Sequence, residues 1–236
     1  MLQGCLNGDR SKLFHPAVPC TPVELALDAR AAVDAGATEL HVHPRGTDGL
    51  ESLHPDDVAP ALRAIRASVP GTPVGISTRW LIRPGGRARH EHIRRWTVLP
   101  DYVSVNLIEE DAPEVIALVL EKGIGVEAGL WSVADAERFI SLSGMHQCLR
   151  VLIEINEQDE DEALQVVREI TRVLDEAGLH LPRLLHGYEA TKWVIYRKAL
   201  ALGLNARIGL EDGAQLPSGE RTTGNAALIR AARQMA

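Results

Sequence analysis

The chain has 236 residues, of which 45% are hydrophobic and 24% are charged, so it can bury a full core and is not intrinsically disordered. The formal net charge of -7, with no lysine–arginine tract near either end, argues against a general nucleic-acid binder. No apolar run approaches the roughly 18 residues of a membrane span, which argues against a transmembrane protein.

Cysteine usage and the first residues bear on the compartment. The three cysteines, Cys5, Cys20 and Cys148, form neither a CxxC pair nor an even set, which predicts free thiols in a reducing compartment. The apolar residues before Asn7 are too few for a signal peptide. We therefore expect a cytoplasmic protein that binds neither nucleic acid nor a membrane.

An alternation of a short apolar strand with a helix repeats along the chain. The expected strands are Leu2–Leu6, Glu39–His43, Thr72–Ser77, Tyr102–Leu107, Ile124–Ala128, Cys148–Ile153, Leu181–Leu185 and Asn205–Leu210. The expected helices are Pro22–Gly36, Asp56–Val69, Arg87–Trp96, Ala112–Lys122, Val133–Leu142, Glu160–Ala177, Ala190–Leu202 and Asn225–Gln234. Capping residues such as Thr21 and closing glycines such as Gly178 mark the helix ends.

This alternation predicts parallel strands. Eight strand–helix units in a chain of this length, with no linker between them, favour a single-domain (β/α)8 TIM barrel over residues 1–236 rather than an open doubly wound sheet. Neither GxGxxG nor GxxxxGK[ST] follows any expected strand, which weakens a nucleotide-binding interpretation.

Polar side chains gather where the expected strands end. They are, strand by strand, Asn7 and Asp9, His41 and His43, Ser77 and Thr78, Ser104 and Asn106, Glu127, Glu154 and Asn156, His186, and Glu211 and Asp212. Earlier residues of the same strands are apolar. Active sites of (β/α)8 barrels lie at the C-terminal strand ends, so the pattern indicates a functional site more strongly than the ordinary polarity of loops.

His41 and His43 are two apart on an expected strand and therefore point to the same face. In a closed barrel the second and eighth strands both flank the first, so Glu211 can converge on the same point. Two imidazoles and a carboxylate with an open position are typical of catalytic zinc. The alternative is that Glu211 pairs with Arg207, that core hydrogen bonds satisfy the histidines, and that no metal binds.

At these residues the chain resembles the β-keto acid cleavage enzymes, a family of zinc-dependent (β/α)8 barrels. The resemblance rests on Asn7-Gly8-Asp9, the His41 and His43 pair, Gly75-Ile76-Ser77-Thr78, Ser104-Val105-Asn106, Glu127 and Arg207-Ile208-Gly209-Leu210-Glu211-Asp212. Members of this family typically take a β-keto acid and acetyl-CoA, and release acetoacetate and a new CoA ester by a retro-Claisen step. A homo-oligomer, either a tetramer or a dimer, is also implied.

The resemblance implies a role for each matching residue. The implied metal ligands are His41, His43 and Glu211. The implied catalytic residues are Asp212 as the proton-abstracting base, Arg207 and Glu127 as its supports, and Ser77 as a hydrogen-bond partner of the substrate or transition state. The implied substrate contacts are Asp9, Thr78, Ser104 and Asn106. The implied cofactor is Zn²⁺, and the implied co-substrate is acetyl-CoA.

Several residues depart from the family pattern. Asp9 stands where a glutamate is usual, and the acidic segment Glu154–Glu160 replaces a glycine-rich stretch after the sixth strand. This segment repels the phosphates of CoA, and Glu189 stands where a basic residue would help to bind a phosphate. A CoA-independent metal-dependent lyase or hydrolase of a small keto acid, a metal-free barrel performing enol chemistry and a catalytically silent barrel therefore remain as alternatives.

A second histidine pair, His90 and His92, lies among arginines on the expected helix Arg87–Trp96. On a helix, side chains two apart point about 200° from one another. The pair is therefore a poor ligand set, and we expect a solvated basic face instead. Trp80 and Trp131 follow the third and fifth strands and are expected either to wall the pocket or to pack.

Overall fold

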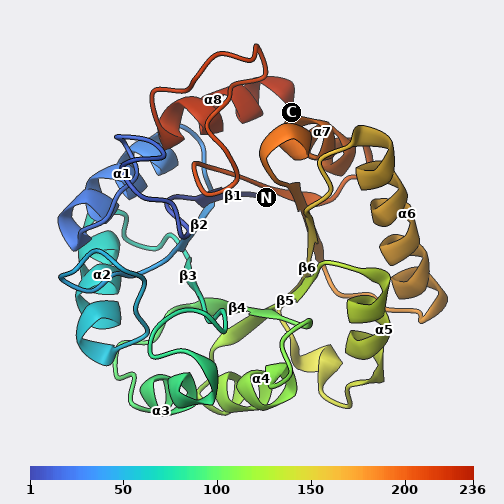
Figure 1. Cartoon of the computed structure of the whole chain (residues 1–236), viewed down its shortest axis with the longest axis horizontal. Coiled ribbons are helices and arrows are strands. Elements are labelled where there is room, and N and C mark those ends of the chain that lie inside the picture. Colours follow the sequence, from blue (N-terminus) through green and yellow to red (C-terminus); the bar gives the residue numbers. More distant parts are fainter.

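Eight parallel strands close into a barrel in which β8 pairs back onto β1 (Figure 1). The computed structural model describes residues 1–236. The strands are β1 (Leu2–Cys5), β2 (Glu39–Val42), β3 (Val74–Ser77), β4 (Tyr102–Asn106), β5 (Gly125–Leu130), β6 (Arg150–Ile155), β7 (Arg183–Gly187) and β8 (Asn205–Ile208). The predicted (β/α)8 barrel is thereby confirmed.

A ring of helices surrounds the strands (Figure 1). They are α1 (Pro22–Asp34), α2 (Pro55–Ser68), α3 (Arg89–Arg94), α4 (Ala112–Glu121), α5 (Val133–Ser141), α6 (Glu160–Glu176), α7 (Lys192–Ala201) and α8 (Asn225–Met235), with short 3-10 turns at Gly86–Ala88, Met145–Gln147 and Glu189–Thr191. None of the helices is both long enough and apolar enough to cross a bilayer.

Local chemistry explains where the helices begin and end. The Thr21 hydroxyl accepts a hydrogen bond from the Glu24 backbone N–H, and the Glu24 carboxylate accepts one from the Thr21 backbone N–H. These two bonds form a capping box at the start of α1. The Asp159 carboxylate accepts two backbone N–H bonds at the start of α6. Gly178 follows α6 with φ 65°, a conformation that glycine adopts without strain.

Three strands extend further than the sequence predicts. β5, β6 and β7 end at Leu130, Ile155 and Gly187, each two residues beyond the expected end. The expected ends of the sixth and seventh strands precede the polar residues Glu154 and His186, but these two side chains are paired in register and continue the strands. β8 instead stops early, because the Asp212 N–H turns back to the Gly209 carbonyl at 3.1 Å.

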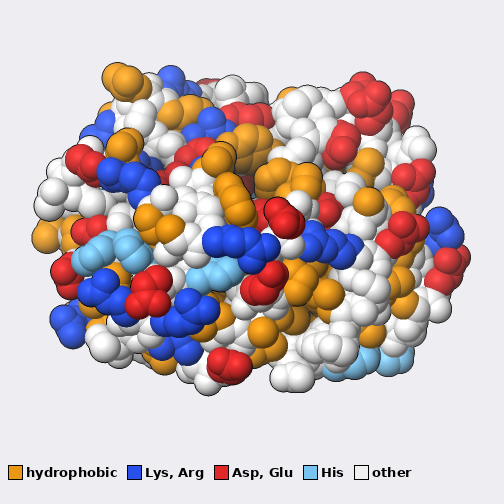
Figure 2. All heavy atoms as spheres, turned by 60° about the horizontal axis from the view of Figure 1, so that its bottom comes forward, with side chains coloured by type: hydrophobic (Ala, Val, Ile, Leu, Met, Phe, Trp, Pro, Cys, Tyr) orange, Lys and Arg blue, Asp and Glu red, His pale blue; other side chains and the backbone are white.

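The expectation of a solvated basic face on the third helix is wrong for its first turn. Arg89 is 0% exposed, and its guanidinium holds both Asp111 oxygens at 2.8 and 2.9 Å. His90 Nε2 lies 2.6 Å from Asp111 Oδ2, so a buried carboxylate ahead of α4 anchors α3. On the exposed side of this region, basic and acidic side chains are intermixed (Figure 2), as in the 2.9 Å pair between Arg87 and Glu114.

A buried polar layer fills the barrel below the strand ends. The Gln3 amide donates to the Tyr102 hydroxyl at 3.0 Å and to Glu127 at 2.8 Å. Arg150 donates to Glu127 at 2.6 Å and to Glu39 at 2.9 Å. These contacts satisfy charges that would be costly to bury alone. Glu127, predicted to support the catalytic base, therefore belongs to this structural layer.

Asp28 on α1 provides a test of the packing between α1, β1 and α8. Asn225 donates to Asp28 at 2.6 Å and to the Leu6 carbonyl at 2.8 Å. Burial raises the pKa of Asp28 to about 6 from an ordinary value of 3.8, although the Asn225 bond opposes this. The native carboxyl therefore keeps its proton up to a higher pH than the unfolded one, and stability falls as pH rises between these values.

We predict that Asp28→Asn, which keeps the acceptor without the charge, stabilises the fold at pH 7.5 by on the order of 1–3 kcal/mol but has little effect at pH 4. Urea unfolding at both pH values measures this. Asp34→Asn, at the exposed end of α1, is the control, with a change below about 0.5 kcal/mol. Equal destabilisation by Asp28→Asn at both pH values would contradict the account.

Candidate active site at the C-terminal strand ends

A cavity of about 210 Å³ lies at the C-terminal ends of the strands. Its lining residues are Asp9, His41, His43, Ser77, Arg79, Ser104, Asn106, Trp131, Glu154, Asn156, Tyr188, Arg207 and Glu211. Most of the strand-end residues singled out in the sequence thus meet in one space. The cavity is small and mostly polar, which suits a small ligand with several oxygen atoms.

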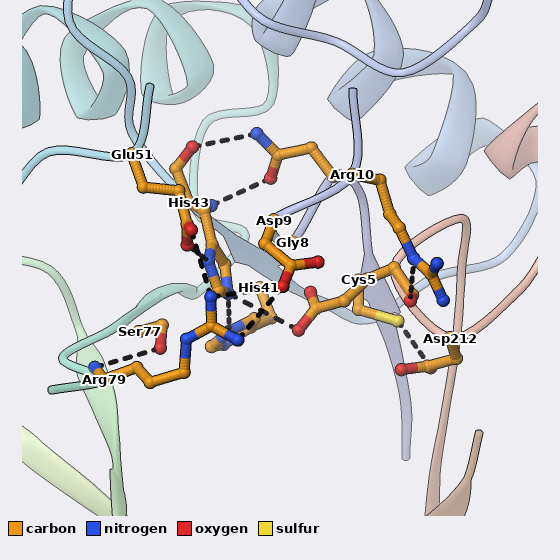
Figure 3. Close-up of polar contacts among 12 residues, drawn as sticks. Cys5, Gly8, Asp9, Arg10, His41, His43, Glu51, Ser77, Arg79 and Asp212 are labelled. Atoms are coloured by element: carbon orange, nitrogen blue, oxygen red, sulfur yellow. Dashed lines mark hydrogen bonds and ion pairs between the residues drawn. The ribbon is translucent and has the colours of Figure 1, made fainter. Parts of the chain in front are cut away.

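His41, His43 and Glu211 form the tightest group in this cavity. One ligand atom from each residue lies within 4.8 Å of the others. The two Nε2 atoms of the histidines are 3.2 Å apart, and His43 Nε2 lies 3.4 Å from Glu211 Oε1. The imidazoles meet edge to face at 72° (Figure 3). The structure therefore brings together the three side chains predicted to bind a metal.

The backbone holds His43 although β2 has already ended. The Asn7 amide donates to the His43 carbonyl at 2.8 Å, and its oxygen accepts from the His43 N–H at 2.8 Å. This pair of hydrogen bonds holds the backbone of His43 beside the end of β1, one residue beyond the end of β2. On the far side of the ring, His43 Nδ1 contacts the Glu51 carboxylate. That contact directs Nε2 into the cavity, as outer carboxylates commonly do for metal-binding histidines.

The donor set fits a divalent cation. Glu211 Oε1 accepts from Arg207 at 2.8 Å, as the alternative interpretation expected, but Glu211 Oε2 is buried and has no hydrogen-bond partner. Burial lowers the pKa of His41 to about 3, so this imidazole is neutral, as a ligand must be. Burial opposes protonation of His43, yet Glu211 and Glu51 outweigh it and raise the pKa of His43 to about 9. The carboxylates here thus favour a bound positive charge.

Asp212 does not line the cavity. Its carboxylate is 0% exposed, accepts from Arg207 at 2.8 Å, and accepts from the Cys5 thiol at 2.7 Å (Figure 3). Burial disfavours the charged form, but Arg207 and His186 hold the pKa of Asp212 well below its usual range. Asp212 is therefore an ionised anchor behind Arg207 in this structure, and its role as the base remains a prediction.

Two other predicted residues lie away from the cavity. Thr78 is buried, and its hydroxyl donates to the Ser104 carbonyl at 2.7 Å, so it braces the β3–β4 junction rather than lining the pocket. Glu127 is held by Gln3 and Arg150 one layer below. Ser77, Ser104, Asn106 and Asp9 do line the cavity, and their role as substrate contacts stays a prediction. Trp131 also lines the cavity, whereas Trp80 does not.

Sequence reasoning missed Glu51 and Arg79. Arg79 donates to Asp9 Oδ2 at 3.1 Å and to Glu51 Oε2 at 3.1 Å. Its guanidinium therefore lies between these two carboxylates, beside the histidine pair (Figure 3). Glu51 arrives from the loop after β2, which folds back in an antiparallel bridge to Arg45. Neither residue lies on a strand, so strand periodicity gave no signal for them.

Comparison with known proteins agrees with this geometry. The family profile described as beta-keto acid cleavage enzyme matches residues 1–236. The 3-oxoadipate:acetyl-CoA acetyltransferase of Cupriavidus necator is 26% identical, over 92% of this chain and 81% of that protein. The 3-keto-5-aminohexanoate cleavage enzyme of Fusobacterium nucleatum is 35% identical over 68 residues, covering 29% of this chain and 25% of that protein.

Solved structures share the fold. The apo structure of ObcA has a TM-score of 0.78 at 15% identity, with 93% of this chain covered. The ternary complex of ObcA with a C4-CoA adduct and oxalate also has a TM-score of 0.78, at 16% identity and the same 93% coverage. This chain spans only 61% and 63% of those two ObcA chains.

The Glu51 contact predicts how metal affinity depends on an outer carboxylate. We predict that Glu51→Gln weakens Zn²⁺ binding by roughly 10- to 100-fold, because the His43 ring loses the charge that orients it. Calorimetric titration of Zn²⁺ into metal-free protein measures the dissociation constant. Asp48→Asn, on the same loop but half-exposed and paired with Arg83, serves as the control. Equal affinity for Glu51→Gln and wild type would contradict this role.

Proposed function

Since the chain belongs to the β-keto acid cleavage enzyme family, we propose that it condenses a β-keto acid with acetyl-CoA and releases acetoacetate and a new CoA ester. The observation that carries the proposal is the convergence of His41, His43 and Glu211 in the polar cavity at the strand ends. The coarser conclusion, an acyltransferase that cleaves a carbon–carbon bond, follows from the family match together with the named relative in Cupriavidus necator.

His41, His43 and Glu211 are the residues that would hold the metal, for which we propose Zn²⁺. A divalent ion held there supplies Lewis-acid stabilisation of negative charge on a substrate oxygen. Ser77, Ser104 and Asn106 line the neighbouring wall and offer hydroxyl and amide donors to the substrate carboxylate and ketone.

Arginine and carboxylate pairs shape the rest of the cavity. Arg207 is buried, and its pKa is raised well above the usual range, because Asp212 and Glu211 outweigh the effect of burial. It therefore stays cationic and attracts an anionic substrate. Asp9 and Arg79 bind each other at the rim, where they meet the variable end of the keto acid.

The chemistry begins with loss of a proton between the ketone and the carboxylate. The resulting carbanion is delocalised as an enolate and attacks the thioester carbonyl, and the CoA thiolate leaves. Attack of that thiolate on the original ketone breaks the old carbon–carbon bond, and the acetoacetate enolate regains a proton. The family resemblance assigns the proton transfers to Asp212, and Asp212→Asn tests this assignment.

A specific observation favours a second candidate, CoA-independent cleavage of a small keto acid. Exposed acids at the start of α6, among them Glu160, Asp161 and Glu162, face solvent near the cavity end of β6, and they repel CoA phosphates. The names of the relatives support CoA use, because one acts with acetyl-CoA and the ObcA complex holds a CoA adduct.

We also propose that the protein is a cytoplasmic homo-oligomer, either a dimer or a tetramer. The apolar side chains of Leu13, Leu27 and Leu81 are exposed and offer surface for subunit contacts. Light scattering after size-exclusion chromatography distinguishes these states from a monomer.

A panel of β-keto acids tests the proposed reaction. We predict that Zn²⁺-loaded protein converts at least one of them to acetoacetate and a CoA ester only when acetyl-CoA is present, and that a chelator abolishes turnover. Mass spectrometry of both products measures this. Turnover without acetyl-CoA would favour the second candidate, and turnover that survives complete metal removal would contradict both. Full turnover by Asp212→Asn would rule out its assignment as the base.

A further inference from the structure

The turn after β8, residues 209–213, carries both Glu211 and Asp212. Because β8 ends at Ile208, the sheet does not hold the carbonyl groups of this turn. Donors from two other loops hold them instead. Arg10, in the loop after β1, donates from Nε to the Glu211 carbonyl at 3.2 Å. Glu189, in the loop after β7, donates from its backbone N–H to the Asp212 carbonyl at 2.7 Å.

Glu189 has an unusual backbone conformation. Its φ of 47° makes it the only residue other than glycine with a positive φ. This left-handed region is unfavourable for a side chain as long as glutamate, whereas asparagine and aspartate tolerate it better. Strained residues of this kind persist only where the surrounding contacts hold them, and they concentrate at functional sites. In this strained conformation the N–H of Glu189 bonds to the carbonyl of Asp212.

The side chain of Glu189 holds Arg10 in place. Its carboxylate forms an ion pair with the Arg10 guanidinium, which lies 4.1 Å from the ring centre of Phe14 and 4.8 Å from that of Tyr188. Arg10 extends from the loop after β1 toward the turn after β8 (Figure 3). A guanidinium presents its donors in a rigid fork. The bond to Glu189 at one end therefore directs Nε at the other end to the Glu211 carbonyl.

The last residue of this turn, Gly213, also packs against Glu189. A Cβ at Gly213 would lie 3.0 Å from Glu189 Oε2, and the φ of Gly213 is 141°. The Lys192 ammonium is buried and donates to the Gly213 carbonyl at 2.6 Å. The three successive carbonyl groups from Glu211 to Gly213 are thus all bound by donors from outside β8. The loops after β1 and β7 therefore determine where the turn lies.

We propose that Glu189 is a positioning residue of the active site, and that it acts through Arg10 to hold the backbone of Glu211 where its carboxylate can bind the metal ion. The inference rests on the proposed function, in which Glu211 is a metal ligand. Neither Glu189 nor Arg10 touches the ion, because both act on the turn from outside the cavity. The Glu189 carboxylate thereby has a partner within the chain, although a basic residue at this position would have suited a phosphate.

Zinc affinity tests this role without a substrate. Zn²⁺ is the probe, and competition with a chromogenic chelator gives the dissociation constant. We predict that Glu189→Gln weakens Zn²⁺ binding about 10-fold, because Arg10 loses the charge that holds it. Arg10→Lys keeps the positive charge, but a single ammonium cannot reproduce the fork that reaches both Glu189 and the Glu211 carbonyl. We therefore predict the same loss, whereas wild-type affinity in Arg10→Lys would overturn the role of the fork.

A double-mutant cycle shows whether the two residues act as one unit. We predict that the variant carrying both Glu189→Gln and Arg10→Lys binds Zn²⁺ no more weakly than either single variant, because each change already breaks the same contact. Independent effects would multiply to about 100-fold and would overturn the proposed unit. The matched control is the exposed pair of Arg172 and Glu176 on α6, 2.9 Å apart. Arg172→Lys and Glu176→Gln are expected to bind Zn²⁺ like wild type.

The outcomes separate this inference from the function on which it rests. Equal Zn²⁺ affinity of wild type and Glu189→Gln would overturn the positioning role and leave the proposed function intact. No Zn²⁺ binding by wild type would overturn the proposed metal site and this inference with it. Should Glu189→Gln fail to fold, as judged by thermal unfolding, Glu189→Gly replaces it, because glycine adopts a positive φ without strain and keeps the N–H. We predict that this variant also binds Zn²⁺ about 10-fold more weakly, and wild-type affinity would overturn the role of the carboxylate.

Discussion

The site depends on how closely the end of β8 approaches β1. A Cβ at Gly209 would lie 1.8 Å from the Cys5 carbonyl oxygen, and a Cβ at Gly8 would lie 2.4 Å from Glu211 Cγ. Gly8 also has φ 54°, where a side chain would be strained. These two glycines leave the space in which the Glu211 side chain can approach His41 and His43, which are held by the strand on the other side of β1.

Barrel closure then concentrates charge in a small buried space. Arg207 bridges Glu211 and Asp212 at 2.8 Å each, while Glu51 and Glu154 each contact a histidine. Burying so many ionisable groups is unfavourable unless each one is compensated. Arg207 compensates two carboxylates, and the imidazoles lie between carboxylates on both walls. The two histidines and Glu211 leave room for a cation among them.

The periodicity of the sequence predicted much of the fold and of the site, because successive side chains of a strand point to opposite faces. It identified the barrel, the strand ends and the face shared by His41 and His43. It did not give the depth of a side chain along the barrel axis. Glu127 faces inward as expected, yet it lies one layer below the cavity beside Arg150, because β4 and β5 are staggered relative to β1 and β8.

Other differences have equally local causes. Thr78 follows Ser77 by one residue and so turns away from the face on which Ser77 lies, as alternation requires. Asp212 lies in the turn after β8, where its N–H bonds to the Gly209 carbonyl, and its carboxylate lies behind Arg207. Glu51 and Arg79 belong to loops, whose paths depend on tertiary contacts such as the Arg45–Glu51 bridge. Sequence patterns therefore located the strand ends, but they did not locate Glu51, the carboxylate that orients His43.

The central claim is that β2 and β8 jointly bind one divalent ion. Zinc K-edge absorption spectroscopy of the loaded protein tests it most directly. The account predicts scattering from two imidazoles and a carboxylate oxygen, with one imidazole lost in His41→Ala and both lost in the double variant with His43→Ala. Zinc neighbours that contain no imidazole, or that stay the same in the double variant, would contradict it.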